Sequence, residues 1–354
     1  MSNNQYDIVI VGGGIVGATF ACALATTSLR ILLLDQQPLS EIKIPNDFDL
    51  RVSALNLGTV QILRDMNVWP LMSQHRISPF SSMHVWDGDG TGAVHFDASE
   101  IGKPALGYII ENSVILKGLY QYLNSKPTIS IGCEPVKAFC LEEQGYQITL
   151  DSGETLMTSL LVGADGAHSH VRNLANIAMT ERDYQHYAVV ATVQTELAHQ
   201  ATAWQAFLQT GPLAFLPLTK DKKDQHHASI VWSTSASHAQ HLIKAKPEDF
   251  CRELEQAFSA RLGKIQEVSQ RIAFPLIERH VDCYTQRRLA LLGDAAHTIH
   301  PLAGQGLNLG ILDAAVLAEE ILLSMQQQRN WASDRVLRRY ERRRKGQNWL
   351  MLKT

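Results

Sequence analysis

Three glycines at positions 12, 14 and 17 separate a β-branched run from an apolar run, and this feature constrains the fold most. Residues 6–11 are expected to form a buried parallel strand and residues 18–26 a helix. With this spacing, Gly12 permits a tight turn, Gly14 lets a pyrophosphate approach the backbone, and Gly17 lets the helix pack closely on the strand. The helix N-terminus offers free N–H groups and a favourable dipole to phosphate. The segment therefore predicts a dinucleotide-binding β-α-β unit.

A second strand and an acid complete this unit. Residues 31–34 are apolar, and Asp35 follows them directly. A carboxylate at this position can accept hydrogen bonds from the ribose hydroxyls of adenosine. The glycine pattern does not by itself distinguish NAD from FAD. Residues 8–25 are uncharged and long enough to resemble a membrane span, but Asp7 and the glycine spacing favour the dinucleotide unit over a transmembrane helix or a secretory signal.

Near the other end of the chain, a carboxylate again follows a buried strand. Residues 289–292 are apolar and lead into Gly293 and Asp294. Asp294 could bind the hydroxyls of the ribityl chain of a flavin, a group that a plain NAD dehydrogenase does not bind. It could also cap the helix that follows, and the two roles are compatible.

The segment at residues 300–313 opens a long apolar helix, expected over residues 304–323. Gly304 and Gly306 at its start offer backbone N–H groups to an anion, such as the pyrimidine ring of a reduced flavin. Pro301 gives a rigid approach to a flat ring. Together with Asp294, this segment favours a flavin over a nicotinamide as the resident cofactor.

Two further polar turns could contact the cofactor or serve only the fold. Asp165 follows the strand expected at residues 160–162, where it either touches a cofactor or forms an ion pair with Arg172. Arg51 stands at the entry of a short helix, from which it could reach a phosphate or the ribityl chain. The alternative for Arg51 is a solvated surface position.

Between the two ends lie short strands and turns, and the fold class expected is α/β. We predict a Rossmann-like FAD-binding domain with an inserted β-sheet-rich substrate domain. The FAD-binding domain is expected to comprise residues 1–70, 105–180 and 275–354, and the substrate domain residues 71–104 and 181–274.

An apolar segment within this insertion, residues 211–218, could form a wall that faces the substrate. Its candidate substrate-lining residues are Phe215 and Pro217. An ordinary core strand explains the same pattern equally well.

Composition excludes several classes of protein. The net charge is −3 and the pI about 6.5, so the basic footprint of a nucleic-acid-binding protein is absent. The five cysteines form no C-x-x-C pair, which indicates reduced thiols and a cytoplasmic protein. His297 and His300 have H-x-x-H spacing, but no cluster of Cys, Asp or Glu accompanies them, so no metal is expected.

Because these motifs occur together, the chain resembles the aromatic-hydroxylase class of FAD monooxygenases, which includes p-hydroxybenzoate hydroxylase, and more narrowly the ubiquinone-biosynthesis hydroxylases. Residues 300–313 are similar to that family's signature around the flavin. The segments similar to the branch that hydroxylates 2-polyprenylphenol are residues 85–87, 111–115, 184–186 and 339–342. The resemblance spans essentially the whole chain.

The resemblance implies roles for the cofactor-binding residues. Those that hold the ADP half of FAD would be Gly12, Gly14, Gly17 and Asp35. Those at the pyrophosphate and the ribityl chain would be Arg51 and Asp294, and those facing the isoalloxazine Gly304, Gly306 and Asn308. Asp165 would belong to a second turn linked to both FAD and NAD(P)H.

The resemblance also implies the reaction. NAD(P)H would reduce the flavin, O2 would add to give a C4a-hydroperoxide, and one oxygen would pass to the aromatic ring of a 2-polyprenylphenol-type ubiquinone precursor. The catalytic base stays unknown at this stage.

A prenylated phenol resides in a bilayer. The arginine-rich residues 335–345 could therefore meet anionic headgroups, or they could form a solvated helix face. Peripheral contact with the inner membrane and membership of a ubiquinone-synthesis complex are the partners expected on this basis. Family members continue further, so a C-terminal portion is expected to be missing here.

Other functions stay open. The chain could hydroxylate a soluble aromatic compound, or it could be a non-oxygenating flavin reductase of the same fold. A flavoprotein that serves only as a scaffold in a lipid-synthesis complex is a third alternative.

Overall fold

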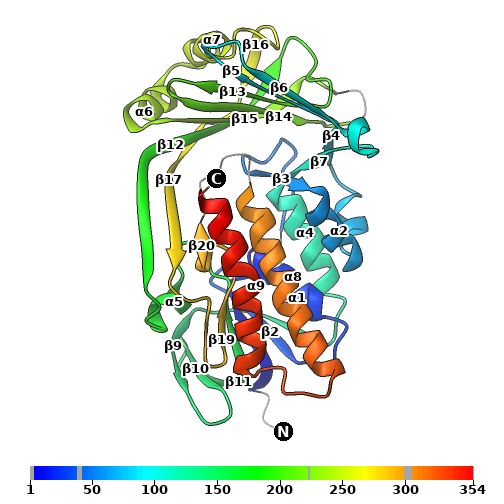
Figure 1. Ribbon diagram of the computed structural model, residues 1–354, viewed down its shortest axis with the longest axis vertical. Helices are drawn as coiled ribbons and strands as arrows, with labels where there is room; N and C mark the ends of the chain where they lie inside the picture. The colour runs from blue at the N-terminus through cyan, green and yellow to red at the C-terminus, as the bar shows by residue number, and fades with distance from the viewer. Residues whose placement is uncertain (1–3, 38–41, 222–223, 299–304, 354) are drawn as a thin grey trace.

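The computed structural model describes residues 4–37, 42–221, 224–298 and 305–353. The molecule is elongated, with a parallel sheet and its helices at one end and a large antiparallel sheet at the other (Figure 1). Two long strands run between the ends. The predicted α/β class, a Rossmann-like unit with an inserted sheet, is confirmed.

The first sheet contains the dinucleotide-type unit. Its central strands run parallel, in the order β19, β11, β1, β2 and β8. Their bounds are β1 (Gln5–Val11), β2 (Ile31–Asp35), β8 (Ile129–Cys133), β11 (Thr155–Gly163) and β19 (Leu289–Leu291). Antiparallel strands complete the sheet: β9 (Val136–Leu141), β10 (Tyr146–Leu150) and β18 (Thr285–Gln286). The inner parallel strands β1, β2, β11 and β19 are mainly apolar and buried, whereas the edge strand β8 is largely exposed.

Four helices pack together beside this sheet (Figure 1). They are α1 (Ile15–Leu24), α4 (Asn112–Leu123), α8 (Gln305–Gln326) and α9 (Asp334–Lys353). The short helix α5 (His170–Leu174) follows β11, and the 3-10 turn η2 (Gly293–Ala295) follows β19. Chain segments from the beginning, middle and end of the sequence therefore meet at one edge of the sheet.

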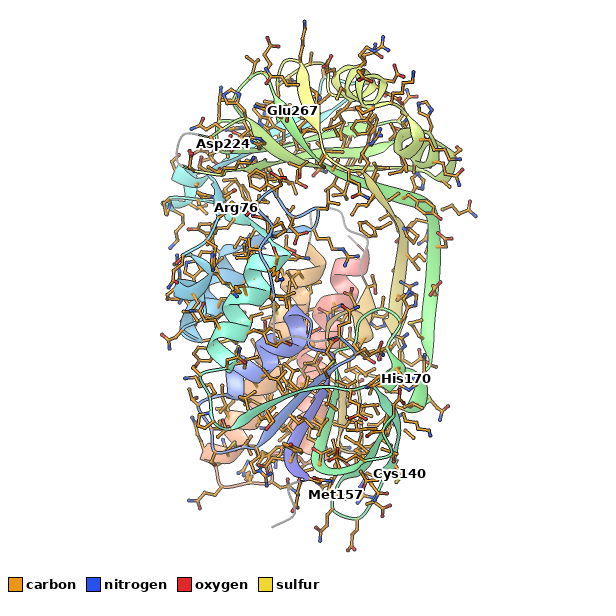
Figure 2. All side chains as sticks on the ribbon, turned by 180° about the vertical axis from the view of Figure 1, so that it is seen from behind. Arg76, Cys140, Met157, His170, Asp224 and Glu267 are labelled. Carbon is orange, nitrogen blue, oxygen red and sulfur yellow. The ribbon has the colours of Figure 1, made fainter. Side chains whose placement is uncertain are left out.

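A three-stranded sheet lies beside the helices, at the junction of the two lobes. Its strands, in spatial order, are β3 (Val52–Asn56), β7 (Gly107–Glu111) and β4 (Ser78–Phe80). Helices α2 (Leu57–Asp65) and α3 (Trp69–Met72) connect β3 to β4. Figure 2 labels Arg76 at this junction.

The second lobe is a nine-stranded sheet whose main path runs β20, β17, β12, β15, β14, β13, β5 and β6. Its strands are β5 (Ser82–Asp87), β6 (Ala93–Asp97), β12 (Met179–Thr195), β13 (Thr202–Leu208), β14 (Gly211–Leu218), β15 (His227–Ser235), β16 (Ile265–Val268), β17 (Ile272–Val281) and β20 (His297–Thr298). Helices α6 (Ala236–Lys244) and α7 (Pro247–Ala257) cover one face and form a core with it. A short 3-10 turn, η1 (Ala98–Ile101), follows β6.

The predicted elements agree closely with those observed. The strand expected at 6–11 is observed as β1, Gln5–Val11, and the helix expected at 18–26 begins earlier, at Ile15, because Gly14 is its N-cap. The apolar stretch at 8–25 is divided between β1 and α1. No helix in the described part of the chain is long and apolar enough to cross a membrane.

The predicted domain limits fall inside continuous strands. Residue 180 lies in β12 and residue 275 in β17, and these two strands pair from Met179–Val281 to Val190–Ile272. β12 has 17 residues, so it spans about 56 Å at the usual rise per residue. The division into two domains therefore stays an approximate prediction, since one strand pair belongs to both lobes.

The two outer glycines of the first turn control how closely α1 approaches it. A methyl group added at Gly17 would lie 2.0 Å from the carbonyl oxygen of Gly12, and one added at Gly12 would lie 2.3 Å from that of Ala164. Gly12 also has a φ of 109°, which side chains disfavour. Gly14 is different, because a methyl group there meets nothing within 4 Å.

We predict that Gly17→Ala destabilises the FAD-free protein by about 1–3 kcal/mol, because α1 must move away from the turn. Gly14→Ala should cost no more than about 1 kcal/mol, the scale of a changed helix cap. Urea denaturation of both variants without added FAD tests this. Equal losses in the two variants would contradict it.

Candidate active site

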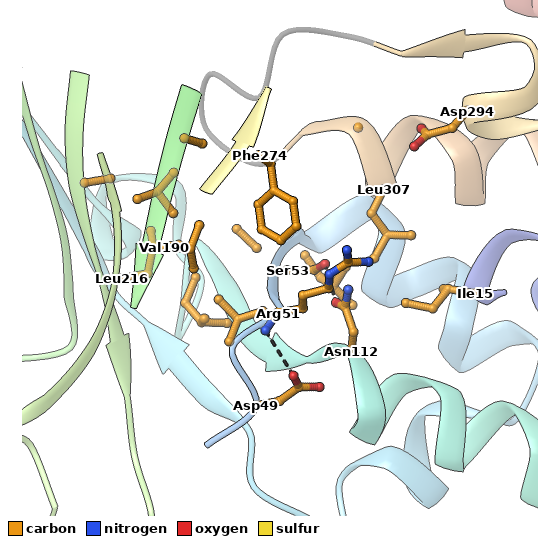
Figure 3. A pocket seen from close by; sticks show the side chains of 18 of the residues that line it. Ile15, Asp49, Arg51, Ser53, Asn112, Val190, Leu216, Phe274, Asp294 and Leu307 are labelled. Carbon is orange, nitrogen blue, oxygen red and sulfur yellow. Dashed lines mark hydrogen bonds between the residues drawn. The ribbon is translucent and has the colours of Figure 1, made fainter. Parts of the chain in front are cut away.

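A cavity of about 1300 Å³ lies between the two lobes. Its volume exceeds the ~300–1,000 Å³ of an ordinary ligand pocket, so it has room for more than one molecule. One wall is built from the loops at the edge of the parallel sheet, and the opposite wall from the open face of the antiparallel sheet (Figure 3). Four of the predicted cofactor residues line it: Gly14, Arg51, Asp294 and Gly306.

The glycine turn presents the start of α1 to this cavity. Gly14 is the N-cap of α1 and has no side chain to bond the free N–H groups of the first turn. The space beside its Cα is open, as the approach of a phosphate requires. This geometry fits the role predicted for Gly14.

Asp35 and Tyr120 hold Gly13 from both sides. The Asp35 carboxylate accepts a hydrogen bond from the Gly13 N–H at 2.7 Å, and the Tyr120 hydroxyl donates to the Gly13 carbonyl at 2.8 Å. Burial raises the pKa of Tyr120, and the Asp35 charge adds to this, so the hydroxyl stays a donor. Asp35 thus stabilises the turn directly, and ribose binding stays a prediction. Tyr120 was not predicted, because only α4 packing brings it to the turn.

Asp294 projects into the cavity from η2. The residue is exposed, and Figure 3 shows its side chain among those that line the cavity. The surrounding protein raises the pKa of its carboxyl by desolvation, although the charges of His297 and Arg279 oppose the change. A carboxyl group in this position can form hydrogen bonds with neutral hydroxyl groups. The buried Arg172 supports the turn by donating to the carbonyl of Ala295 at 3.1 Å.

A buried ionic network fixes the backbone on either side of Asp294. Asp313 of α8 accepts hydrogen bonds from the Gly293 N–H at 3.1 Å, His297 Nε2 at 2.5 Å and Arg344 Nε at 2.6 Å. Asp313 and Arg344 are both fully buried. Burial alone would raise the pKa of Asp313, but His297 and Arg344 outweigh it and hold the pKa below its usual range. η2, α8 and α9 are therefore joined by one charged centre.

This network changes the interpretation of the arginine-rich tail. Arg344 faces the core, and Arg343 pairs with Glu319 and Glu320 of α8 at 2.7 and 2.9 Å. The side chains of α9 that remain exposed include Arg335, Arg338 and Arg342. The cluster is thus partly structural, and only its outer members are accessible to a surface.

The start of α8 lines the cavity through Gly306 and the side chain of Leu307 (Figure 3). The side chain of Asn308 is buried, and it bonds β3 by accepting from the Asn56 N–H and donating to the Ala54 carbonyl. Its side chain therefore anchors α8 to β3, and the flavin contact of Asn308 stays a prediction. Pro301, Gly304 and His300 lie outside the described residues. Within the described ranges no group of three metal-ligating side chains occurs.

Arg51 lies at the centre of the cavity, beside Asp49, Ser53 and Asn112 (Figure 3). Its guanidinium carbon is 4.9 Å from the centre of the Phe274 ring, so Arg51 connects the two walls. Asp49 holds this segment in place by accepting from the Arg51 N–H at 3.0 Å.

A second ion pair supports the Asp49 loop and was not predicted. Arg76 forms a bidentate pair with the buried Glu111, with distances of 2.9 and 2.8 Å. Glu111 also accepts from the Asp49 N–H at 2.7 Å. The sequence contains no local signal for this arrangement, because Arg76 and Glu111 meet only through the three-stranded sheet.

Asp165 caps α5. Its carboxylate accepts from the His170 N–H at 2.7 Å, the Val171 N–H at 3.0 Å and the Ser169 hydroxyl. The guanidinium of Arg172 donates to the carbonyls of Ala295 and Ala167, and the charge of Asp165 favours its cationic form without a direct hydrogen bond between the two side chains. The neighbours of Asp165 on either side, Ala164 and Gly166, line the cavity.

The prediction that Phe215 and Pro217 line the substrate side of the cavity is wrong. Strand β14 does face the cavity, but through Pro212, Ala214 and Leu216. Successive side chains of a strand point to opposite faces. Phe215 therefore points away and stacks on Phe258 with ring centres 3.9 Å apart, and Pro217 shares its face. The prediction identified the strand but assigned the wrong face.

Two hydroxyl groups at the cavity wall have unused hydrogen-bonding capacity. The hydroxyls of Ser113 and Thr298 are buried at its wall and have no partner among the described residues. Together with the open space at Gly14 and Gly306, these groups fit an extended ligand that carries a pyrophosphate along its length and a polar ring at one end. FAD has this form.

Known proteins resemble this chain over nearly its whole length. A family model described as an FAD binding domain matches residues 5–354. The chain is 35% identical to 3-demethoxyubiquinol 3-hydroxylase of Escherichia coli, over 99% of this chain and 88% of that protein. It is 34% identical to ubiquinone hydroxylase UbiL of Rhodospirillum rubrum, over 98% of this chain and 79% of that protein.

A solved structure supports the fold. The crystal structure of PqsL of Pseudomonas aeruginosa in complex with 2-aminobenzoylacetate superposes with a TM-score of 0.83 at 22% identity. The superposition covers 99% of this chain and 94% of PqsL.

We predict that Asp313→Asn lowers the free energy of unfolding by about 3–5 kcal/mol at neutral pH, because Arg344 is left buried without its countercharge. Glu319→Gln is the matched control: it removes an exposed partner of Arg343 and should cost about 1 kcal/mol or less. Urea denaturation of both variants measures the difference.

The same substitution has a predicted pH dependence. The lowered pKa of Asp313 stabilises the fold above the ordinary carboxyl pKa of about 4, and this stabilisation is lost as the pH falls through the lowered value. The gap between the wild-type protein and Asp313→Asn should therefore narrow below about pH 4. A gap independent of pH would show that the charge of Asp313 is not its cause.

Proposed function

Since the chain belongs to the family of FAD-dependent monooxygenases, we propose that it hydroxylates the aromatic ring of a 2-polyprenylphenol-type ubiquinone precursor, with NAD(P)H and O2 as co-substrates. The relatives named above support a hydroxylation in ubiquinone synthesis, since one is named 3-demethoxyubiquinol 3-hydroxylase and the other ubiquinone hydroxylase. The ring position and the particular precursor are part of the proposal.

One observation carries this proposal. A single cavity joins the phosphate-type turn at Gly14 to the apolar face of the antiparallel sheet. A cofactor that extends from the turn would bring its ring to the centre of the cavity, near Arg51 and Phe274. A substrate ring held against the sheet would then lie beside the cofactor ring.

The roles of the cofactor residues follow from this arrangement. The start of α1 at Gly14 would bind the pyrophosphate, with Gly12 and Gly17 setting its position and Asp35 near the ribose. Asp294 would bind ribityl hydroxyls, and Arg51 the pyrophosphate or the ribityl chain. The backbone at the start of α8, from Gly306 to Asn308, would face the pyrimidine end of the ring.

Bound FAD supplies the reaction of a reduced flavin with O2 and the transfer of one oxygen atom to the substrate. The chain itself orients the rings and keeps water from the reacting centre. The apolar side chains of β12, β14 and β15 at the cavity serve this second task, and those at its wall include Val190, Leu216 and Val231.

The chemistry of the substrate wall favours a prenylated phenol over a soluble aromatic acid. Among the described lining residues from the segment 181–274, none is Lys, Arg, His, Asp or Glu. A carboxylate substrate would call for a cation on this wall. The apolar wall instead matches a neutral ring with a hydrocarbon substituent.

A prenylated substrate implies access to a bilayer. The outer arginines of α9, at positions 335, 338 and 342, are the basic groups that we propose for contact with anionic headgroups. The protein would then be cytoplasmic and peripheral at the inner membrane, where a ubiquinone-synthesis complex could receive it.

We predict that the purified holoenzyme incorporates one labelled oxygen atom into a 2-polyprenylphenol when supplied with NAD(P)H and isotopically labelled O2. Mass spectrometry of the product provides the measurement. Consumption of NAD(P)H without label in the phenol would favour the reductase alternative, and label only in small soluble phenols would favour the soluble hydroxylase.

Deletion of the gene in its host tests the pathway. The expected result is accumulation of 2-polyprenylphenol and depletion of ubiquinone in a mass spectrum of the quinone lipids. An unchanged lipid profile, in a host with no second enzyme for the step, would contradict the assignment to ubiquinone synthesis.

A further inference from the structure

The cavity face of the antiparallel sheet continues without interruption to the edge of the sheet. Side chains opposite each other on paired strands share a face. One such row begins in the cavity at Val190 and passes through paired residues to the edge strand β6. Its members are Val190, Val231, Ala214, Gln205, Val85 and Val94.

The neighbouring rows have the same course. Phe207 is paired with the cavity-lining Pro212, and Phe96 is paired with the cavity-lining Met83. All three rows therefore lead from the wall of the cavity to β6 and the outer end of β13. These strands lie at the far end of the molecule from the parallel sheet (Figure 1).

At this edge the apolar side chains are exposed. Val94, Phe96 and Phe207 have exposed fractions of 52%, 48% and 47%, and we call these three residues the edge patch. Phe96 belongs both to the edge patch and to the cavity lining, so the cavity opens onto the patch. On the opposite face of the same strands, Trp86 is buried against Phe258 of the helical layer.

The charges around the edge patch limit what can cover it. The hairpin of β5 and β6, residues 82–97, contains Asp87, Asp89 and Asp97, and it contains no Lys or Arg. Carboxylates repel an anionic membrane surface. An uncharged hydrocarbon chain has no such conflict, and it gains free energy by covering exposed apolar area.

We infer that the edge patch is the binding site for the distal part of the substrate's hydrocarbon chain, which leaves the cavity along the open face of the sheet. The inference rests on the proposed function, since it takes a prenylated phenol as the substrate. From β12 to β6 the sheet face extends over five strand spacings, about 24 Å at the usual separation of strands. A short substituent would end inside the cavity, and only a long one would reach the patch.

The test compares two ligands on the oxidised holoenzyme without NAD(P)H, so that no turnover occurs. Equilibrium dialysis gives the Kd of 2-prenylphenol and of 2-geranylgeranylphenol. The wild-type enzyme should bind the longer ligand more tightly. We divide the Kd of 2-prenylphenol by the Kd of 2-geranylgeranylphenol. In the double variant Val94→Gln/Phe207→Gln, this ratio should fall by about tenfold, because the distal part of the longer chain loses its apolar contact.

Leu141→Gln is the matched control. Leu141 is 42% exposed, but it lies on β9, in the parallel-sheet lobe. This variant should keep the wild-type ratio. The inference is overturned if the wild-type enzyme does not bind the longer ligand more tightly than the shorter one, or if the double variant keeps the wild-type ratio of Kd values. It is also overturned if Leu141→Gln lowers this ratio as much as the double variant does.

A membrane contact at the patch would give a different result. The double variant would then lose co-sedimentation with neutral phosphatidylcholine vesicles and keep its preference for the longer ligand, which would also overturn the inference. Failure of the proposed function is separate: it would appear as tight binding of the long phenol without incorporation of labelled oxygen.

Discussion

The turn after β1 and the turn after β11 lie so close together that no side chain fits between them, and the rest of the cofactor lobe depends on this contact. A side chain at Gly12 would overlap the carbonyl of Ala164, and one at Gly17 would overlap Gly12 itself. The contact brings the carboxyl ends of two parallel strands to one point, where ligands bind in sheets of this kind. Asp35 and Tyr120 then hold Gly13 between them, so the start of α1 is presented to the cavity in a fixed orientation.

The buried charge of Asp313 has a similar role at the other cofactor wall. Burying a carboxylate and a guanidinium is costly, and the cost is offset only when both are well paired. Here Asp313 bonds Arg344, His297 and the backbone of Gly293 at once. Helix α9 is therefore joined to the cofactor lobe, because its Arg344 pairs with the carboxylate that also bonds the turn of Asp294.

The strand pair of β12 and β17 relates the two lobes to each other. Both strands begin or end beside the parallel sheet and continue into the antiparallel sheet, so the substrate wall is held opposite the cofactor wall by continuous backbone pairing. The two walls differ in chemistry. Loops and helix ends supply polar backbone and carboxylates on one side, and a strand face supplies apolar side chains on the other. The cavity between them therefore suits a polar cofactor and an apolar substrate.

The amino-acid sequence alone was enough to predict the local features: the glycine turn, the strands on both sides of it, the carboxylate after β19 and the α/β class. These follow from backbone sterics and from short-range periodicity, which act within a few residues. Which face of β14 lines the cavity depends instead on how the folded elements pack. Helices α6 and α7 bury its other face, so apolar residues occur on both sides and alternation cannot distinguish Phe215 from Leu216.

The same reason applies to Asn308, Asp165 and Arg344. Each has a residue type that suits ligand binding, yet each bonds a partner within the protein: Asn308 bonds β3, Asp165 bonds α5, and Arg344 bonds Asp313. The partners of Asn308 and Arg344 are remote in sequence, and that of Asp165 depends on how the turn closes. Whether a polar side chain serves the ligand or the fold is therefore decided by contacts that form only when the chain has folded.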